Sequence, residues 1–197
     1  MATNDVVAQT EDILNIKDIE DAKATISKYA RKTPLIQSMF LSRQVADANV
    51  FMKLENMQLT GSFKFRVANN RMQHLSKEEA ERGVITASAG NHAQGVALSG
   101  KLLGIDTTVV MPDEAPMMKR AATAGYGAEV DIHGATFDDA HEWMFERAKK
   151  EGKTIVDPFN DKYVMAGQGT IGLEILDDLW NVDTVLVPVG GGGLMAG

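Results

Sequence analysis

The sequence predicts an α/β protein in which parallel strands are covered by helices on both faces. From residue 84 onward, short apolar runs alternate with longer amphipathic stretches, and Gly or Pro separates them. Strands and helices that alternate with short loops form parallel sheets, because each helix returns the chain to the start of the next strand. The 197 residues, 44% of them hydrophobic, are enough for one full domain or two small ones.

The part of the chain before residue 84 is less regular. Pro34 ends the first helix, because the residue before a proline avoids the helical region. Ser38 and Ser62 are placed to cap the two helices that follow them. The elements predicted here are a polar tail at 1–14, helices at Ile16–Tyr29 and Met39–Ala46, a strand at Val50–Leu54, and a helix from Ser62 to about Leu75.

The alternating part supplies the remaining elements. The predicted strands are Val84–Ser88, Thr107–Met111, Ala128–His133, Thr154–Val156 and Thr184–Val189. The predicted helices are His92–Leu103, Ala115–Ala124, Phe137–Lys150 and Gly167–Trp180. Ligands of such sheets bind outside the carboxyl ends of the strands, so the residues that follow each strand are the first place to look for a site.

Composition excludes several classes of function. A net charge of −7 argues against a protein that binds nucleic acids in general, because such a protein needs a basic face to attract them. The chain has no Cys, so disulfides and metal sites with thiolate ligands are excluded, and we predict no metal centre. The absence of Cys also fits a cytoplasmic protein. Met1–Gln9 lacks the pattern of a signal peptide, and the apolar stretch Thr184–Gly197 is broken by Pro188, so we expect no membrane partner.

Lys64 is the first candidate functional residue. If Ser62 caps the helix, Lys64 occupies its second position, where the helix dipole disfavours a cation. Phe63 and Phe65 would lower the pKa of the amine further by desolvating it. A neutral amine is a nucleophile that condenses with an aldehyde, so Lys64 is a candidate for carrying a covalent cofactor. The alternative is a solvated lysine beside two core phenylalanines.

Two further motifs follow predicted strands. Ser88-Ala89-Gly90-Asn91-His92 joins a strand to a helix start, where free N–H groups favour a carboxylate, although Ser88 or Asn91 could simply cap the helix. Gly190-Gly191-Gly192-Gly193 follows the last apolar run, and its N–H groups could form a nest for a phosphate, although it could also be a flexible loop. Together with Lys64, these are the parts needed to hold pyridoxal phosphate and an amino acid.

With these motifs in this order, the chain resembles the threonine/serine dehydratases among the fold-type II pyridoxal-phosphate enzymes, and in particular their short catabolic form. The resemblance extends from about residue 16 to the end. It rests on Thr33-Pro34-Leu35, Glu55-Asn56-Met57-Gln58, Thr60-Gly61-Ser62-Phe63-Lys64, Ser88-Ala89-Gly90-Asn91-His92, Ala166-Gly167-Gln168-Gly169-Thr170-Ile171-Gly172-Leu173-Glu174 and Gly190-Gly191-Gly192-Gly193-Leu194.

The resemblance implies an α,β-elimination that converts L-threonine or L-serine to a 2-oxo acid and ammonia. Lys64 would bind the cofactor and act as base at the substrate Cα, Phe63 would pack beside the pyridine ring, and Asn91 would donate to the ring oxygen. The substrate carboxylate would be held by the turn Ser88, Ala89, Gly90, Asn91, His92, and the phosphate by Gly190, Gly191, Gly192, Gly193 and Leu194. Thr60, Gln94 and Tyr126 would contact a nucleoside monophosphate effector at an interface of a homo-oligomer, a dimer or tetramer.

The resemblance also implies a fold like that of the tryptophan synthase β chain, with two three-layer α/β domains. Residues 80–158 would form the small domain, and 1–79 with 159–197 an incomplete large domain, because relatives continue well past Gly197. We therefore expect a front portion that is inactive or weakly active alone and that hides an exposed apolar face by association.

Two positions depart from the family pattern. Val67 stands where relatives usually have a glycine, and a branched side chain there could crowd the helix beside the cofactor. Ala89 stands where amino-acid racemases of this group have a serine, so racemisation should be poor. The alternative enzymes are a serine racemase and a β-replacement synthase, although synthases usually have a threonine where this chain has His92. A different class of protein is a non-catalytic, nucleotide-binding regulatory module.

Overall fold

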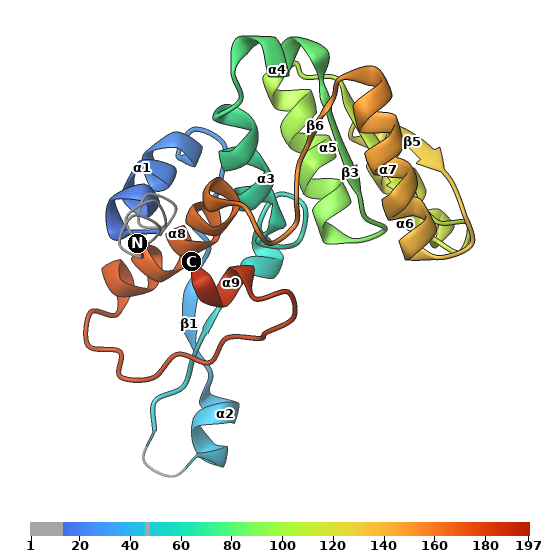
Figure 1. Cartoon of the computed structure of the whole chain (residues 1–197). Helices are drawn as coiled ribbons and strands as arrows, with labels where there is room; N and C mark the ends of the chain where they lie inside the picture. The colour runs from blue at the N-terminus through green and yellow to red at the C-terminus, as the bar shows by residue number, and fades with distance from the viewer. Residues whose placement is uncertain (1–13, 46–47) are drawn as a thin grey trace, which may run out of the picture.

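The computed structural model describes residues 14–45 and 48–197, so nearly all of the predicted polar tail lies outside the described residues. One end of the molecule is a four-stranded parallel sheet in the order β5-β4-β3-β6 (Figure 1). Its strands are β3 (Val84–Ala87), β4 (Thr107–Met111), β5 (Glu129–Ile132) and β6 (Thr154–Ile155). Its helices are α4 (Lys77–Arg82), α5 (Asn91–Leu103), α6 (Met117–Gly125) and α7 (Phe137–Glu151). The parallel sheet confirms the α/β prediction.

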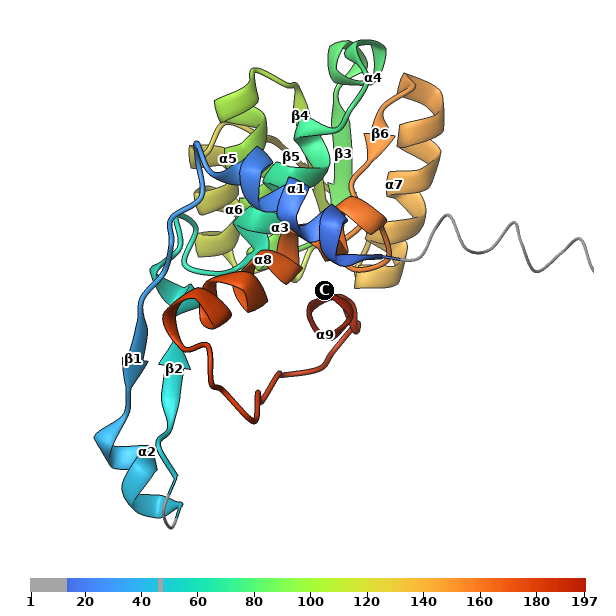
Figure 2. The same ribbon diagram turned by 90° about the vertical axis from the view of Figure 1, so that its left-hand side faces the viewer.

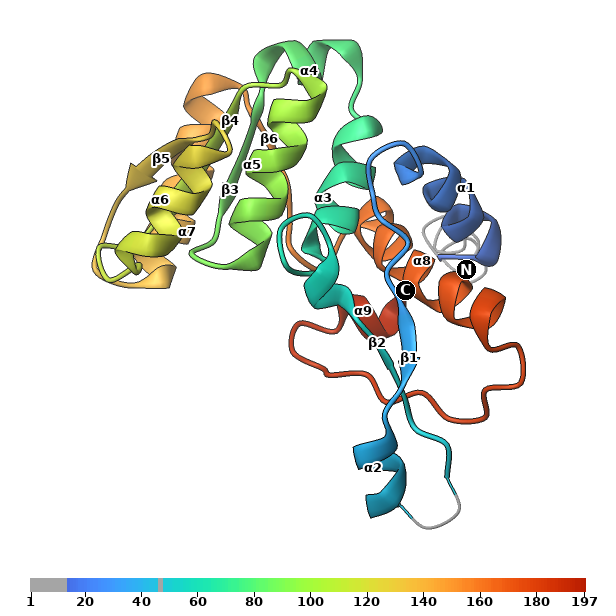
Figure 3. The ribbon, with the colours of Figure 1, turned by 180° about the vertical axis from the view of Figure 1, so that it is seen from behind.

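The two faces of this sheet are covered by different helices. Ile85 and Val110 pack against α7 at Met144, whereas Val109 packs on the opposite face against Ala97 of α5 (Figure 3). Alternate residues of a strand point to opposite faces, so strands that are apolar throughout bury both faces. This end of the molecule therefore has three layers, with α5 and α6 on one side and α7 on the other.

The other end of the molecule is mostly helical. It contains α1 (Ile16–Ile26), α3 (Lys64–Gln73), α8 (Lys162–Asp178) and α9 (Gly193–Ala196), with an antiparallel arm of β1 (Leu35–Gln37) and β2 (Phe51–Lys53) that carries α2 (Met39–Gln44) (Figure 2). A short 3-10 helix, η1 (Glu55–Met57), links the arm to the turn before α3. None of the described helices combines the length and apolar character needed to cross a membrane.

Helix α3 is packed closely by two other helices, and glycines permit both approaches. A Cβ atom on Gly95 of α5 would lie 2.6 Å from the carbonyl oxygen of Lys64, and one on Gly167 of α8 would lie 2.9 Å from that of Arg66. Any larger residue at either position would force backbone apart. Val67 is fully buried in this packing, so the branched side chain is accommodated where the family pattern has glycine.

Several element boundaries differ from the predictions. Helix α3 begins at Lys64 with Phe63 as its N-cap, one residue later than predicted. Ser62 therefore precedes the N-cap, and Lys64 is in the first helical position, not the second. The Ser62 hydroxyl still accepts from the Lys64 N–H at 3.4 Å. Helix α8 begins five residues before the predicted Gly167, because the Asp161 side chain caps it by accepting from the Val164 N–H at 3.0 Å.

The predicted strand at Thr184–Val189 is wrong. The segment has no regular structure, and Leu186 is 92% exposed and Val189 67% exposed. Among the described residues no strand pairs with it, and a β-strand is stabilised by its partners rather than by the intrinsic preferences of its residues. Apolar, β-branched composition therefore predicted a strand that has nothing to pair with here.

The helical end is held together by a buried ionic cluster around Arg66. The Arg66 guanidinium pairs with Glu55 at 2.9 Å and with Glu174 at 2.6 Å, and 1% of its side chain is exposed. Lys53 also pairs with Glu174 at 2.6 Å, with both side chains 8% exposed. The cluster joins β2, η1, α3 and α8, so four separate elements are connected by one network of ion pairs.

We predict that Glu174→Ala destabilises the protein by about 3–5 kcal/mol, because it leaves Arg66 and Lys53 buried without their shared partner. Urea unfolding followed by circular dichroism measures the change in the free energy of unfolding. The matched control is Glu81→Ala, which breaks an exposed pair with Lys77 at 3.8 Å and should change little. Equal losses from the two variants would contradict this assignment.

Candidate active site

Lys64 lies at the start of α3 with its amine directed into the structure rather than into solvent. The Nζ atom donates to the carbonyl oxygen of Pro158 at 2.6 Å, and it lies 4.5 Å from the ring centroid of Phe159 and 5.4 Å from that of Phe63. The charge of an ammonium is attracted to such ring faces, while the rings remove water from around it. The predicted aromatic neighbour Phe63 is therefore present, and Phe159 is a second one.

The pKa of Lys64 is lowered from 10.5 to about 8. Burial is the main cause, and the nearby carboxylate of Asp157 opposes it by favouring the charged form. At pH 7 about one amine in ten would be neutral, several hundred times the fraction expected for an unperturbed lysine. The predicted activation of this amine is thus supported, with burial rather than the helix dipole as its principal cause.

The glycine run lies close to the same point. A Cβ atom on Gly191 would lie 2.5 Å from the ring of Phe159, so this glycine packs flat against the ring that also contacts Lys64. Gly192 has φ +83, a conformation that favours glycine, and Gly193 begins α9, which packs on α8 (Figure 2). Phe159 therefore links the lysine to the loop of four glycines.

The turn after β3 also reaches Lys64, through α5. Ser88 directly follows the strand, and its hydroxyl accepts from the Gly90 N–H at 3.2 Å, while the exposed Asn91 starts the helix. His92 is 3% exposed, and its Nε2 atom lies 3.0 Å from the carbonyl oxygen of Val156. The side chain of His92 thus points into the protein, so its predicted contact with a carboxylate would have to be made by its backbone.

Ala89 and Leu194 complete the predicted set. Ala89 is half-buried between Ser88 and Gly90 and packs against the core cluster beneath α5. Leu194 is half-buried in α9, one residue after the glycines. Ala89 therefore lies within the turn after β3 and Leu194 directly follows the glycine loop, and their contacts with a substrate or cofactor stay predictions.

The three predicted effector residues lie on three different elements. Thr60 is buried in the turn before α3, and its hydroxyl has no hydrogen-bond partner. Gln94 is half-buried in the first turn of α5, and Tyr126 caps the end of α6 and packs against the sheet. Their contact with an effector stays a prediction.

Two features near Lys64 were not found from the sequence. Phe159 sits in a loop, where an aromatic residue carries no periodic signal that would mark a site. Gln168 of α8 is 1% exposed, its Nε2 atom has no hydrogen-bond partner, and a Cβ on Gly193 would lie 2.8 Å from that atom. A buried donor without an acceptor next to a glycine loop is a signal that only the structure reveals.

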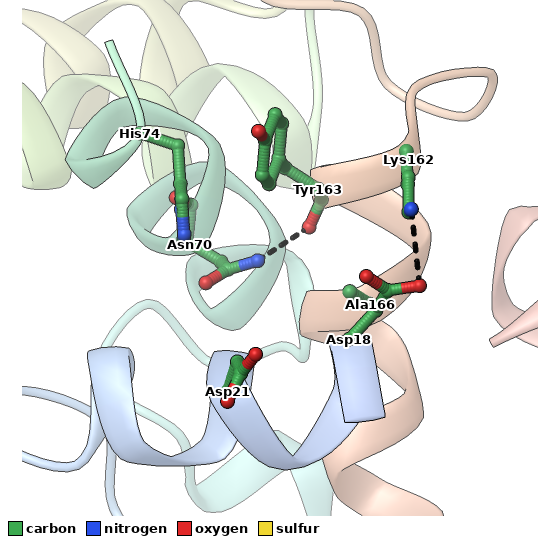
Figure 4. Close-up of a pocket in the computed structure, with 7 residues that line it drawn as sticks. All are labelled: Asp18, Asp21, Asn70, His74, Lys162, Tyr163 and Ala166. Atoms are coloured by element: carbon green, nitrogen blue, oxygen red, sulfur yellow. Dashed lines mark hydrogen bonds and ion pairs between the residues drawn. The ribbon is translucent and has the colours of Figure 1, made fainter. Parts of the chain in front are cut away.

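A separate cavity of about 260 Å³ lies between α1, α3 and α8 (Figure 4). It is lined by Asp18, Asp21, Asn70, His74, Lys162, Tyr163 and Ala166, none of which is a predicted site residue. Lys162 pairs with Asp18 at 3.2 Å, and the Asn70 amide donates to the Tyr163 carbonyl at 2.7 Å. This cavity is therefore distinct from the region where Lys64 and the glycine loop meet.

Comparison with known proteins identifies relatives of the whole chain. The family model described as "Pyridoxal-phosphate dependent enzyme" matches residues 26–197. A protein named L-threonine dehydratase catabolic TdcB, from Staphylococcus aureus strain USA300, is 62% identical over all 197 residues. The alignment covers 57% of that relative, so the chain spans little more than half its length.

Solved structures agree with this result. Threonine deaminase isoform 2 from Solanum lycopersicum has a TM-score of 0.87 and 43% identity, with 91% of this chain and 49% of that chain covered. Maize serine racemase has a TM-score of 0.89 and 36% identity, with 92% and 55% covered. The same fold therefore occurs in proteins named for deamination and for racemisation.

We predict that the amine of Lys64 titrates near pH 8, so its acylation rate should level off above that pH. Lys17, whose side chain is 75% exposed and whose pKa is raised by its hydrogen bond to Asp21, is the internal control, and its rate should keep rising above that pH. Pulse labelling with an acylating reagent, followed by peptide mass spectrometry, measures both in one sample. A common titration curve would show that Lys64 is not desolvated.

We predict that Gly191→Ala displaces the glycine loop only while the ring of Phe159 is present, because the added methyl would meet that ring. Binding of 4′-deoxypyridoxine 5′-phosphate, which has no aldehyde, reports on the loop without any reaction at Lys64. Affinity should fall about tenfold or more in Gly191→Ala, and less when Gly191→Ala is added to Phe159→Ala. Equal losses in both backgrounds would contradict the contact.

Proposed function

This chain belongs to the pyridoxal-phosphate dependent enzymes, and on that premise we propose that it forms part of an enzyme that deaminates L-threonine and L-serine. The products would be 2-oxobutanoate and pyruvate, respectively, with ammonia. The observation that carries the proposal is the position of Lys64. Its amine has a pKa of about 8 and lies against the ring of Phe159, on which Gly191 of the glycine loop packs, while its backbone is approached by Gly95 of α5. Relatives and structural neighbours named threonine dehydratase and threonine deaminase support this choice of substrate.

The residues around Lys64 fit pyridoxal phosphate. Gly193 is buried where a Cβ would collide with its surroundings, and the unpartnered amide of Gln168 beside it is a donor suited to a phosphate oxygen. Pyridoxal phosphate supplies an aldehyde that condenses with amines and a ring that accepts the electron pair released when a Cα–H bond breaks. Lys64 would hold the aldehyde carbon, and Gly190–Gly193 with Leu194 would hold the phosphate.

The chain's own residues would carry out proton transfer, substrate binding and the exclusion of water. The Lys64 amine, once free, would take the proton from the substrate Cα, which requires the neutral form that its burial favours. N–H groups of the turn Ser88–His92 would bind the substrate carboxylate, and the exposed Asn91 side chain would donate to the ring oxygen. The rings of Phe63 and Phe159 would keep water away from the amine.

The proposal includes features of the larger protein. Residues 80–158 would be the small domain and 1–79 with 159–197 part of the large one, in a cytoplasmic homo-oligomer, a dimer or tetramer. Exposed apolar side chains support association, namely Met117 and Met118 on α6, 83% and 85% exposed, and Phe40 on α2, 71% exposed. Thr60, Gln94 and Tyr126 would contact a nucleoside monophosphate effector.

Serine racemase is the second candidate, because maize serine racemase has a TM-score of 0.89 with this chain. Racemisation requires a proton donor on the face of the substrate opposite the lysine. Ala89 has no hydroxyl to supply that proton at the position where racemases of this group have a serine. Elimination is therefore favoured over racemisation.

We predict that borohydride reduction fixes pyridoxal phosphate on Lys64 of the purified protein, that this chain alone releases 2-oxobutanoate from L-threonine only weakly, and that Lys64→Ala abolishes both. Peptide mass spectrometry locates the adduct, and a coupled dehydrogenase assay measures the 2-oxo acid. Lys53, 8% exposed and paired with Glu174, is an internal control that should stay unmodified.

The same samples distinguish the alternatives. Chiral chromatography should show that the remaining L-serine stays enantiomerically pure, and rapid appearance of D-serine would favour the racemase. A colourless protein that binds a nucleotide and forms no adduct would favour the regulatory module. An adduct at Lys64 with no 2-oxo acid formed would reject the deaminase activity for this chain.

A further inference from the structure

The carbonyl group of Val156 is held by two buried side chains. It accepts from the Thr86 hydroxyl at 2.9 Å and lies 3.0 Å from Nε2 of His92. The Val156 N–H donates to the carbonyl oxygen of Ile85 at 3.0 Å. Residue 156, at the end of β6, is therefore fixed on both sides, by β3 and by the first turn of α5.

The residues that follow Val156 make the closest contacts with Lys64. Pro158 supplies the carbonyl oxygen that accepts from the Lys64 amine at 2.6 Å, and the Phe159 ring lies 4.5 Å from that amine. The Asp157 carboxylate accepts from the N–H groups of Phe159 and Asn160, each at 2.7 Å, which makes the turn rigid. Displacing Val156 would thus move the groups that desolvate Lys64.

The hydrogen bond to Val156 also defines the state of the His92 ring. A carbonyl oxygen only accepts, so Nε2 must carry the proton, and the buried Nδ1 atom has no partner. Burial is the main reason that the pKa of His92 is lowered to about 4, and the charge of Lys64 also lowers it. The hydrogen bond to the Val156 carbonyl and the charge of Asp157 act in the opposite direction. The ring is therefore neutral near pH 7, and it is not placed to act as an acid or as a cation.

We propose that His92 is a positioning residue for Lys64: its Nε2–H group fixes the Val156 carbonyl, and the segment Val156–Phe159 transmits that constraint to the lysine amine. This role differs from carboxylate binding, which the position of His92 in its motif predicts. Its importance for catalysis rests on the proposed function, but the constraint itself exists in the protein without cofactor and is tested there.

The first experiment compares the pKa of Lys64 in three variants without cofactor, by NMR of amines that carry ¹³C-methyl groups. His92→Leu removes the donor while keeping an apolar side chain of similar size. The segment should then loosen and admit water, and the pKa of Lys64 should rise from about 8 by about one unit or more. His92→Gln keeps an N–H donor of similar reach and should retain the low value.

Met144→Ala is the matched control for a general loss of stability. Met144 is 2% exposed in the cluster between the sheet and α7, on the face opposite α5. Its truncation should destabilise the protein without changing the pKa of Lys64. An unchanged Lys64 pKa in His92→Leu, or an equal rise in Met144→Ala, would overturn the proposal.

A second measurement does not depend on any variant that might fail to fold. The ¹⁵N chemical shifts of the imidazole nitrogens report which one carries the proton. We expect the neutral Nε2–H tautomer from pH 6 to pH 8, with no titration in that range. A neutral ring with its proton on Nδ1, which has no Nε2–H to donate, would show that His92 does not hold the Val156 carbonyl.

Discussion

The charge of Arg66 is almost completely removed from water, and that constraint determines how the helical end is built. Burying a guanidinium is unfavourable unless carboxylates and hydrogen-bond acceptors surround it. Glu55 and Glu174 do so, and Arg66 also donates to the carbonyl oxygen of Arg31 at 3.1 Å. Since these partners come from different parts of the chain, α3 can adopt few positions that satisfy all of them at once.

The position of Lys64 follows from that of Arg66, which lies two residues later on the same helix. Gly95 and Gly167 let α5 and α8 approach α3 on either side, so the first turn of the helix is enclosed and carries both Lys64 and the buried charge network of Arg66. Among the described residues, the Lys64 amine contacts a carbonyl oxygen and two rings and forms no ion pair with a carboxylate. Burial therefore has opposite results for these two neighbouring residues. Arg66 is kept charged by its carboxylate partners, whereas Lys64 is made easier to deprotonate.

The sequence predicted the elements that carry a periodic apolar pattern bounded by turn residues. The parallel strands β3 to β6 and helices α5 and α7 came from periodicity and turn residues, and β4 was predicted with its observed bounds. The failures concern partners that sequence does not reveal. Strand β1 is stabilised by pairing with β2, the segment Thr184–Val189 lacks a described partner, and Phe159 matters only because Gly191 and Lys64 approach it from elsewhere.

The motif around His92 predicts where the backbone lies but not where each side chain points. The motif correctly places residues 88–92 at the carboxyl end of a strand, because backbone position is set by the order of elements. The direction of each side chain is set by packing, which differs between neighbours: Asn91 is exposed, whereas His92 is enclosed and bonds to Val156. Two adjacent residues of one motif therefore have separate roles, one available to a ligand and one holding the scaffold that presents the lysine.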